Sequence, residues 1–79
     1  MNEKITAKIA AHKSRLEMIK EHITRDAGIL AHWVTENTDD PLTLARWFDN
    51  QTQQIKESIR LAAIEQQYID TFEYVLRSE

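Results

Sequence analysis

The sequence contains no cysteine, one glycine and one proline among its 79 residues. Without cysteine there is no disulfide and no thiolate metal ligand, and such a composition fits a reducing compartment. The scarcity of glycine and proline leaves few residues suited to turns, so we expect few secondary-structure elements, each of them long. Residues that favour helix dominate the remainder. The composition therefore predicts an all-α protein.

Long hydrophobic runs are also missing. No stretch approaches the ~18 apolar residues that a membrane-spanning helix requires, and the first residues, MNEKITAKIA, lack the apolar centre of a signal peptide. We therefore expect no membrane association and a cytoplasmic location. A chain of this length forms at most one small domain, here residues 1–79, and such a domain buries only about 60% of the surface that its unfolded chain exposes. Additional packing is expected to stabilise it.

Hydrophobic residues in the first half of the chain recur with a seven-residue period. Together with two polar interruptions they form one seam: Ile5, Ile9, His12, Leu16, Ile19, Ile23, Asp26, Leu30 and Trp33. This pattern predicts a coiled-coil helix from about residue 3 to 36. The phase is the same before and after Gly28, so we expect the helix to continue through that glycine. The alternative is a break near Gly28 that folds residues 29–34 back over the rest of the chain.

The segment TENTDDPLTL is the one strong helix stop. Pro41 suits the first turn of a new helix, and Asp40 or Thr38 can cap it. The sequence predicts a turn at about residues 37–41 and a second helix from about 41 to 77. A connection this short makes the two helices antiparallel. The predicted fold is a helical hairpin.

Folding the chain about residue 39 or 40 sets the register between the helices. It places Ile9 near Ile69, Leu16 near Ala62, Ile19 near Ile59, Ile23 near Ile55, and Trp33 near Trp47 and Phe48. The same register places His12 opposite Gln66, and Asp26 near Thr52 and Gln53. Polar residues thus meet polar residues, an arrangement that fixes alignment in coiled coils at some cost in stability.

The second helix carries more apolar surface than one neighbouring helix can cover. The stripe expected to face the first helix consists of Leu44, Phe48, Ile55, Ile59, Ala62, Ile69 and Leu76. A further group, which we call the interface patch, consists of Leu61, Ile64, Tyr68, Phe72 and Val75. Soluble monomers rarely expose a patch of this kind. We expect a second copy to cover it, giving a homodimeric four-helix bundle, with a different protein as the alternative cover. On the second helix, Ile64 is expected to lie nearly opposite the stripe that faces the first helix.

Charge is unevenly distributed along the chain. Residues 1–25 carry a net charge of +3, and the remainder carries −6. The basic residues of the first helix, which we call together the basic flank, lie on both sides of the seam: Lys4, Lys8 and Arg15 on one side, and Lys13 and Lys20 on the other. These side chains could contact phosphates, which makes a nucleic-acid-binding bundle the alternative function. We favour ion pairs with Glu65, Asp70 and Glu73 across the hairpin, because residues 1–25 contain no aromatic residue for base stacking.

Three aromatic residues, Trp33, Trp47 and Phe48, surround the acidic turn. We call them the docking tip. They either plug the open end of the bundle or anchor a partner protein, since tryptophan is enriched in binding hot spots.

The sequence offers little support for catalysis or metal binding. The residue three positions before each histidine is an isoleucine, so the Glu-x-x-His motif of two-iron bundles is absent. His22 and Asp26 could share an ion or a hydrogen bond, but two ligands do not make a metal site. We expect no enzyme activity and no metal or other cofactor. The expected function is that of a small adaptor or regulator that binds another protein, for example a modulator or inhibitor such as a phage or plasmid product.

Overall fold

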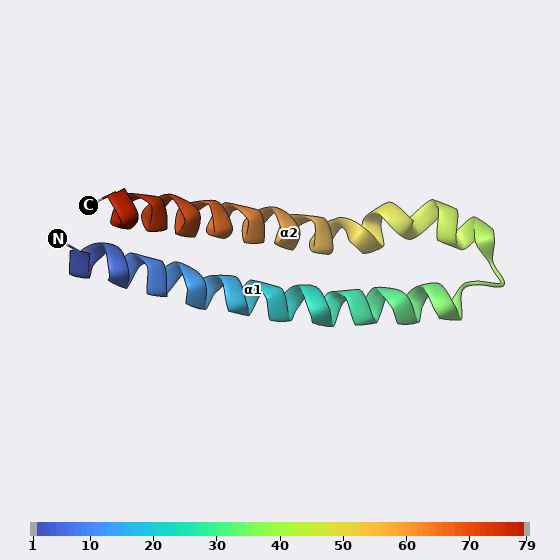
Figure 1. Cartoon of the computed structure of the whole chain (residues 1–79). Helices are drawn as coiled ribbons and strands as arrows, with labels where there is room; N and C mark the ends of the chain where they lie inside the picture. The colour runs from blue at the N-terminus through green and yellow to red at the C-terminus, as the bar shows by residue number, and fades with distance from the viewer. Residues whose placement is uncertain (1, 79) are drawn as a thin grey trace.

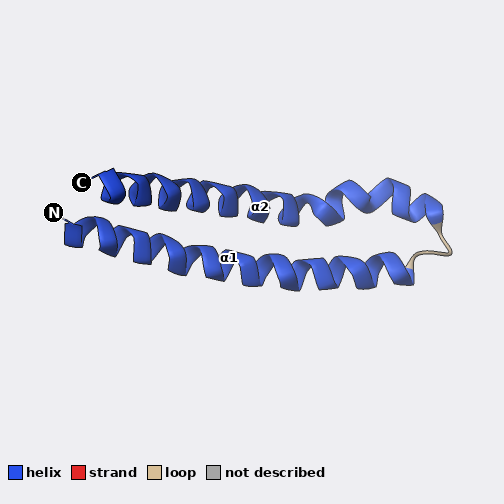
Figure 2. Ribbon diagram, viewed as in Figure 1, coloured by secondary structure: helices blue, strands red, loops and turns tan. Residues whose placement is uncertain are grey.

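The computed structural model describes residues 2–78, which form two antiparallel helices joined by a short loop (Figure 1). Helix α1 spans Asn2–Glu36 and helix α2 spans Pro41–Ser78. Both ends of the chain lie together at one end of the molecule, and the loop lies at the other (Figure 2). The molecule measures 58 × 16 × 14 Å. The all-α hairpin predicted from the sequence is therefore confirmed.

Helix α1 passes through Gly28 without a break, as its hydrophobic phase predicts. A Cβ atom at Gly28 would have no neighbour within 4 Å, so this glycine faces open space and no close packing requires it. A turn that would fold residues 29–34 back over the molecule is therefore excluded.

The loop is held by local hydrogen bonds from polar side chains. At the end of α1, the amide of Asn37 donates to the carbonyl oxygen of Trp33 at 2.8 Å. At the start of α2, Asp40 Oδ1 accepts from the Thr43 backbone N–H at 3.2 Å, and Asp40 Oδ2 accepts from the Thr43 hydroxyl at 2.6 Å. These bonds lower the pKa of Asp40. Asp40 is thus the N-cap of α2, and Pro41 occupies the first helical position, where a missing N–H costs nothing.

The predicted seam of α1 is confirmed along its length. Between residues 2 and 33, the side chains that are buried or half-buried are those of the nine seam positions. The core cluster lies in the half of the hairpin that carries the termini, which we call the terminal half. Its buried members are Ile9, Leu16 and Ile69, with exposures of 8%, 6% and 3%. Ala62 packs against this cluster, so the predicted register holds there.

The stripe of α2 that was expected to face α1, which we call the seam of α2, is wrong at two positions. Ile59 is 53% exposed and Phe48 is 45% exposed, although both were expected to face α1. Ser58, which precedes Ile59 in the sequence, is half-buried instead. Thr52, four residues after Phe48 in the sequence, is buried. Neighbouring residues on a helix differ by about 100° in direction. The helix phase therefore directs a serine inward and leaves the adjacent isoleucine in solvent.

Over residues 26–55, which we call the loop half, no hydrophobic side chain is fully buried. Thr52 is the buried residue of this half, with 7% exposure. Asp26 is half-buried on α1, and its Oδ2 atom is shielded from solvent without a hydrogen-bond partner. Asp26 and Thr52 are thus half-buried and buried where the sequence predicts a polar layer, whereas Gln53, the third predicted member, is exposed. These polar side chains interrupt the apolar core.

Candidate interaction surface

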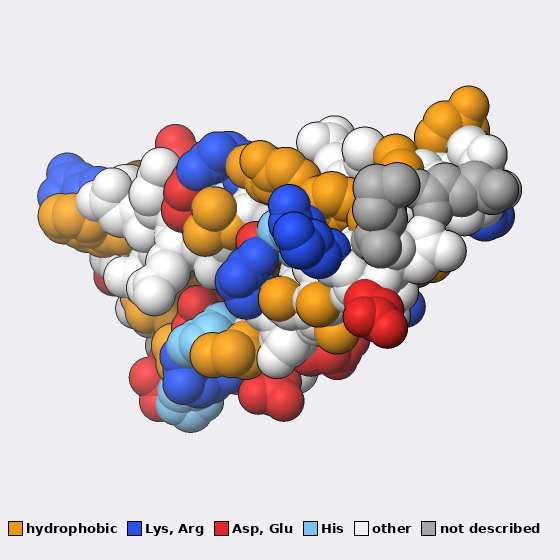
Figure 3. Space-filling view, turned by 90° about the vertical axis from the view of Figure 1, so that its left-hand side faces the viewer, with side chains coloured by type: hydrophobic (Ala, Val, Ile, Leu, Met, Phe, Trp, Pro, Cys, Tyr) orange, Lys and Arg blue, Asp and Glu red, His pale blue; other side chains and the backbone are white. Residues whose placement is uncertain are grey.

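The interface patch lies on α2 in the terminal half, beside the core cluster. Leu61, Tyr68 and Val75 are 40%, 50% and 39% exposed. Phe72 is half-buried because it also packs against the core. Viewed from the end that carries the termini, hydrophobic side chains lie at the surface between charged ones (Figure 3). The hairpin alone therefore leaves much of the patch in contact with water.

Ile64 differs from its expected environment. It is half-buried, although it was expected to be exposed in a single hairpin. Ile64 lines a shallow open hollow with Gln67, Tyr68 and Thr71, and all four residues belong to α2. The neighbours that line this hollow with Ile64 are thus on its own helix.

His12 connects the patch to α1. Its ring stacks on Tyr68, with centroids 4.9 Å apart and planes 14° from parallel. A second, looser stack joins His12 to Phe72 at 5.7 Å. The two aromatic residues at the centre of the patch are therefore held by a side chain from the opposite helix.

The predicted partner of His12 is wrong. The histidine pairs with Glu65 rather than with Gln66, which is exposed and donates to Asp70 at 2.9 Å. A carboxylate can only accept, so His12 Nδ1–H donates to Glu65 Oε2. Arg15 Nε also donates to Glu65, at 3.3 Å. The hydrogen bond from His12, together with the nearby charge of Arg15, holds the pKa of Glu65 below its ordinary value.

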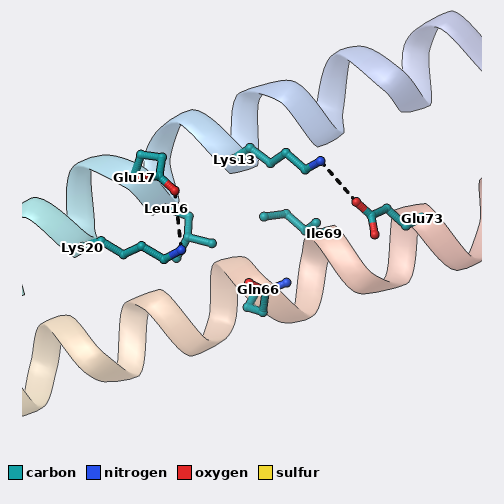
Figure 4. Close-up of a pocket in the computed structure, with 7 residues that line it drawn as sticks. All are labelled: Lys13, Leu16, Glu17, Lys20, Gln66, Ile69 and Glu73. Atoms are coloured by element: carbon teal, nitrogen blue, oxygen red, sulfur yellow. Dashed lines mark hydrogen bonds and ion pairs between the residues drawn. The ribbon is translucent and has the colours of Figure 1, made fainter.

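Most of the basic flank is engaged within the hairpin. Lys13 pairs with Glu73 across the two helices at 3.4 Å, and Lys20 pairs with Glu17 on its own helix at 3.5 Å (Figure 4). These pairs flank the contact between Leu16 and Ile69. On the other flank Arg15 binds Glu65, and the Lys8 ammonium lies 5.6 Å from the centre of the Phe72 ring. Lys4 is exposed, and among residues 2–78 its side chain forms no hydrogen bond or ion pair.

Two of the three predicted acidic partners thus serve the basic flank, namely Glu65 and Glu73. Asp70 instead accepts from Gln66. The basic flank consequently has fewer free cations than the sequence suggests, and a phosphate backbone would have to compete with the existing pairs.

The docking tip is partly open to solvent. Trp47 and Phe48 are 46% and 45% exposed, and Trp33 is half-buried. Leu42 was not among the residues predicted for this tip. It lies five residues before Trp47 in the sequence and is 82% exposed. The aromatic residues therefore do not form a closed plug in the single hairpin. The exposure of Leu42 follows from its place one residue after Pro41 at the helix start, a position that faces away from the seam.

The histidines do not assemble a metal site among residues 2–78, where no group of three suitable ligands occurs. His22 Nδ1 accepts from Arg25 Nη2 at 2.7 Å, and the anticipated contact with Asp26 is not formed. Asp26 Oδ1 instead lies 3.9 Å from Arg25 Nε. Over the same residues, neither helix has a stretch long and apolar enough to cross a lipid bilayer.

No family model, curated protein or solved structure matches the chain. We therefore infer function from the exposed surfaces of the hairpin.

Proposed function

We propose that the protein is a small, non-enzymatic adaptor or regulator that self-associates through the interface patch and binds another protein. The observation that carries this proposal is the exposure of Leu61, Tyr68 and Val75 directly beside the core cluster. Two hairpins that bury these patches against each other form a four-helix bundle. The absence of cysteine fits a cytoplasmic setting for such an assembly.

The expected dimer is weak enough to dissociate on dilution. Complete burial of a large apolar side chain contributes roughly 1.5–3 kcal/mol. Leu61, Tyr68 and Val75 are about half exposed in the single hairpin, so about half of that contribution remains to be gained when a dimer buries them. Six such side chains in a symmetric dimer then contribute on the order of 6 kcal/mol. The cost of association begins at about 4 kcal/mol. The gain exceeds this lower limit by a small margin, so the proposed assembly depends on protein concentration.

The docking tip is the second surface of the proposal. Its exposed aromatic side chains are suited to anchor a larger protein, and the acidic residues of the turn surround them. Such a partner would make the hairpin a modulator or inhibitor. The ion pairs of Lys13, Arg15 and Lys20 weigh against nucleic-acid binding, because those cations already have carboxylate partners.

A matched pair of substitutions tests self-association. Ile64→Glu places a charge in the patch, and Ile59→Glu places the same charge on an exposed isoleucine outside it. We expect Ile64→Glu to yield a helical monomer and Ile59→Glu to retain the wild-type mass, measured by light scattering with circular dichroism as a check on folding. An Ile64→Glu protein that retains the wild-type mass would contradict the proposed surface.

Retention on immobilised random-sequence DNA at low and high salt tests the alternative. We expect no retention at either salt concentration. Retention at low salt that is lost steeply as salt rises would favour the nucleic-acid function.

A further inference from the structure

The residues of the interface patch are spaced symmetrically along α2. From Leu61 to Val75 the intervals are three, four, four and three residues, with Tyr68 at the centre. Read in the reverse direction, the spacing is unchanged. Both outer residues, Leu61 and Val75, have nearly equal exposures of 40% and 39%, and the central tyrosine is 50% exposed.

A two-fold symmetric contact uses the same surface on both subunits, so that residue i meets residue j and residue j meets residue i. Two α2 helices packed antiparallel about Tyr68 meet this condition. Each Leu61 is then level with Val75 of the second copy, and each Ile64 is level with Phe72. The two tyrosines lie together at the two-fold axis.

Charge distinguishes this arrangement from a parallel one. The loop half carries five acidic side chains and one arginine, a net charge of −4, whereas the remaining residues of the hairpin carry +1. A parallel dimer would place two loop halves of the same strong charge side by side. An antiparallel dimer centred on Tyr68 overlaps the nearly neutral terminal halves and sends the loop halves in opposite directions.

We infer that the cover of the interface patch is a second copy of this chain, bound antiparallel with α2 against α2 and the two-fold axis at Tyr68. This inference rests on the proposed self-association and adds its geometry. One consequence is an elongated dimer that presents a docking tip at each end. Both tips remain free for partner proteins, because the overlap is confined to the terminal halves.

Spin labels test the geometry, since the chain has no cysteine of its own. Asn50 is exposed in the loop half and lies 18 residues from Tyr68. At 1.5 Å per residue, two Asn50→Cys labels in the antiparallel dimer are about 55 Å apart along the axis. In a parallel dimer they lie side by side, within roughly 30 Å, because each hairpin is 16 × 14 Å in cross-section.

A label at Tyr74→Cys provides the control. Tyr74 is 66% exposed, lies outside the patch and is six residues from Tyr68. Two labels there are separated by only ~18 Å along the axis in the antiparallel dimer, so a short distance is expected in either geometry. A long distance at Asn50 together with a short one at Tyr74 is the expected result of double electron–electron resonance.

The other outcomes overturn the inference in different ways. Short distances at both sites indicate a parallel dimer, which refutes the geometry and leaves self-association intact. The absence of any intermolecular distance, with a monomeric mass by sedimentation, refutes self-association as well. Adding Tyr68→Glu to the Asn50→Cys protein should abolish the long distance, and adding Ile59→Glu should preserve it. A distance that survives Tyr68→Glu would place the contact elsewhere.

Discussion

Replacement of Asp26 by leucine is expected to stabilise the hairpin. Asp26 occupies a seam position of α1, where its side chain is 15% exposed and its Oδ2 atom is buried without a donor. Leu30 and Ile55 lie near it and line the same hollow. A buried polar atom without a partner costs about 1–3 kcal/mol. Leucine removes that cost and adds apolar contacts with its neighbours.

The expected increase in the free energy of unfolding is at least about 2 kcal/mol, from the unpaired oxygen and part of the gain from burying a leucine. For a small protein this shifts the midpoint of urea unfolding upward by roughly 1–2 M. Circular dichroism at one fixed protein concentration measures the shift. Asp49→Leu is the matched control, because Asp49 is exposed and its replacement should change stability by no more than ~0.5 kcal/mol. A lower midpoint for Asp26→Leu would refute the reasoning that the buried Oδ2 atom of Asp26 lacks a partner.

Three further predictions follow from single residues. Gly28→Ala should raise the free energy of unfolding by about 1 kcal/mol, because the new methyl group meets open space and alanine favours helix; thermal unfolding that shows a decrease would contradict this. Leu16→Ala should lower it by about 2–5 kcal/mol, while Met18→Ala, at a position 59% exposed, should change it little; equal urea midpoints would argue against the core assignment. In the folded protein the pKa of Glu65 lies below 4.5, the ordinary value for a glutamate, so the ionised carboxylate stabilises the fold above that pH and this stabilisation is lost as pH falls and the group is protonated. Glu65→Gln removes this titrating group. The variant should therefore lose less stability than the wild type as pH falls below 4.5. Glu57→Gln, whose partner lies on the same helix, should have a smaller effect, and acid titrations in which the two variants coincide would contradict the role of Glu65.

The sequence predicts α1 well because the hydrophobic residues of this helix are also the ones that its periodicity directs toward α2. Every seam residue from Ile5 to Trp33 is apolar, or is one of two polar interruptions, and each is buried or half-buried in the structure. The turn is predicted equally well, since Asp40 and Pro41 have strong positional preferences at a helix start.

In α2 the polarity of a residue does not always match the direction in which its side chain points. Ser58 faces inward and Ile59 outward, so a search for hydrophobic residues selects the wrong neighbour. The same one-residue difference explains why His12 meets Glu65 instead of Gln66. A strict alternation of three and four residues from Ile55 to Leu76 would have identified Ser58 and Glu65 as seam positions.

The candidate interaction surfaces were predicted only in part. Periodicity identifies which apolar residues lie outside the seam, and the exposure of Leu61, Tyr68 and Val75 agrees with it. It does not reveal that Ile64 is half-buried in a hollow lined by residues of its own helix, or that His12 stacks on the patch. Such contacts depend on side-chain directions that a one-dimensional pattern does not contain.

The most direct test of self-association is the mass of the unmodified protein in solution as a function of its concentration. Sedimentation equilibrium should show a mass near 9.3 kDa at the lowest concentrations and about twice that value as concentration rises. This result is predicted because Leu61, Tyr68 and Val75 are exposed in the single hairpin and would be covered in the proposed dimer. A mass that stays at the value of one chain across the whole range would contradict the account.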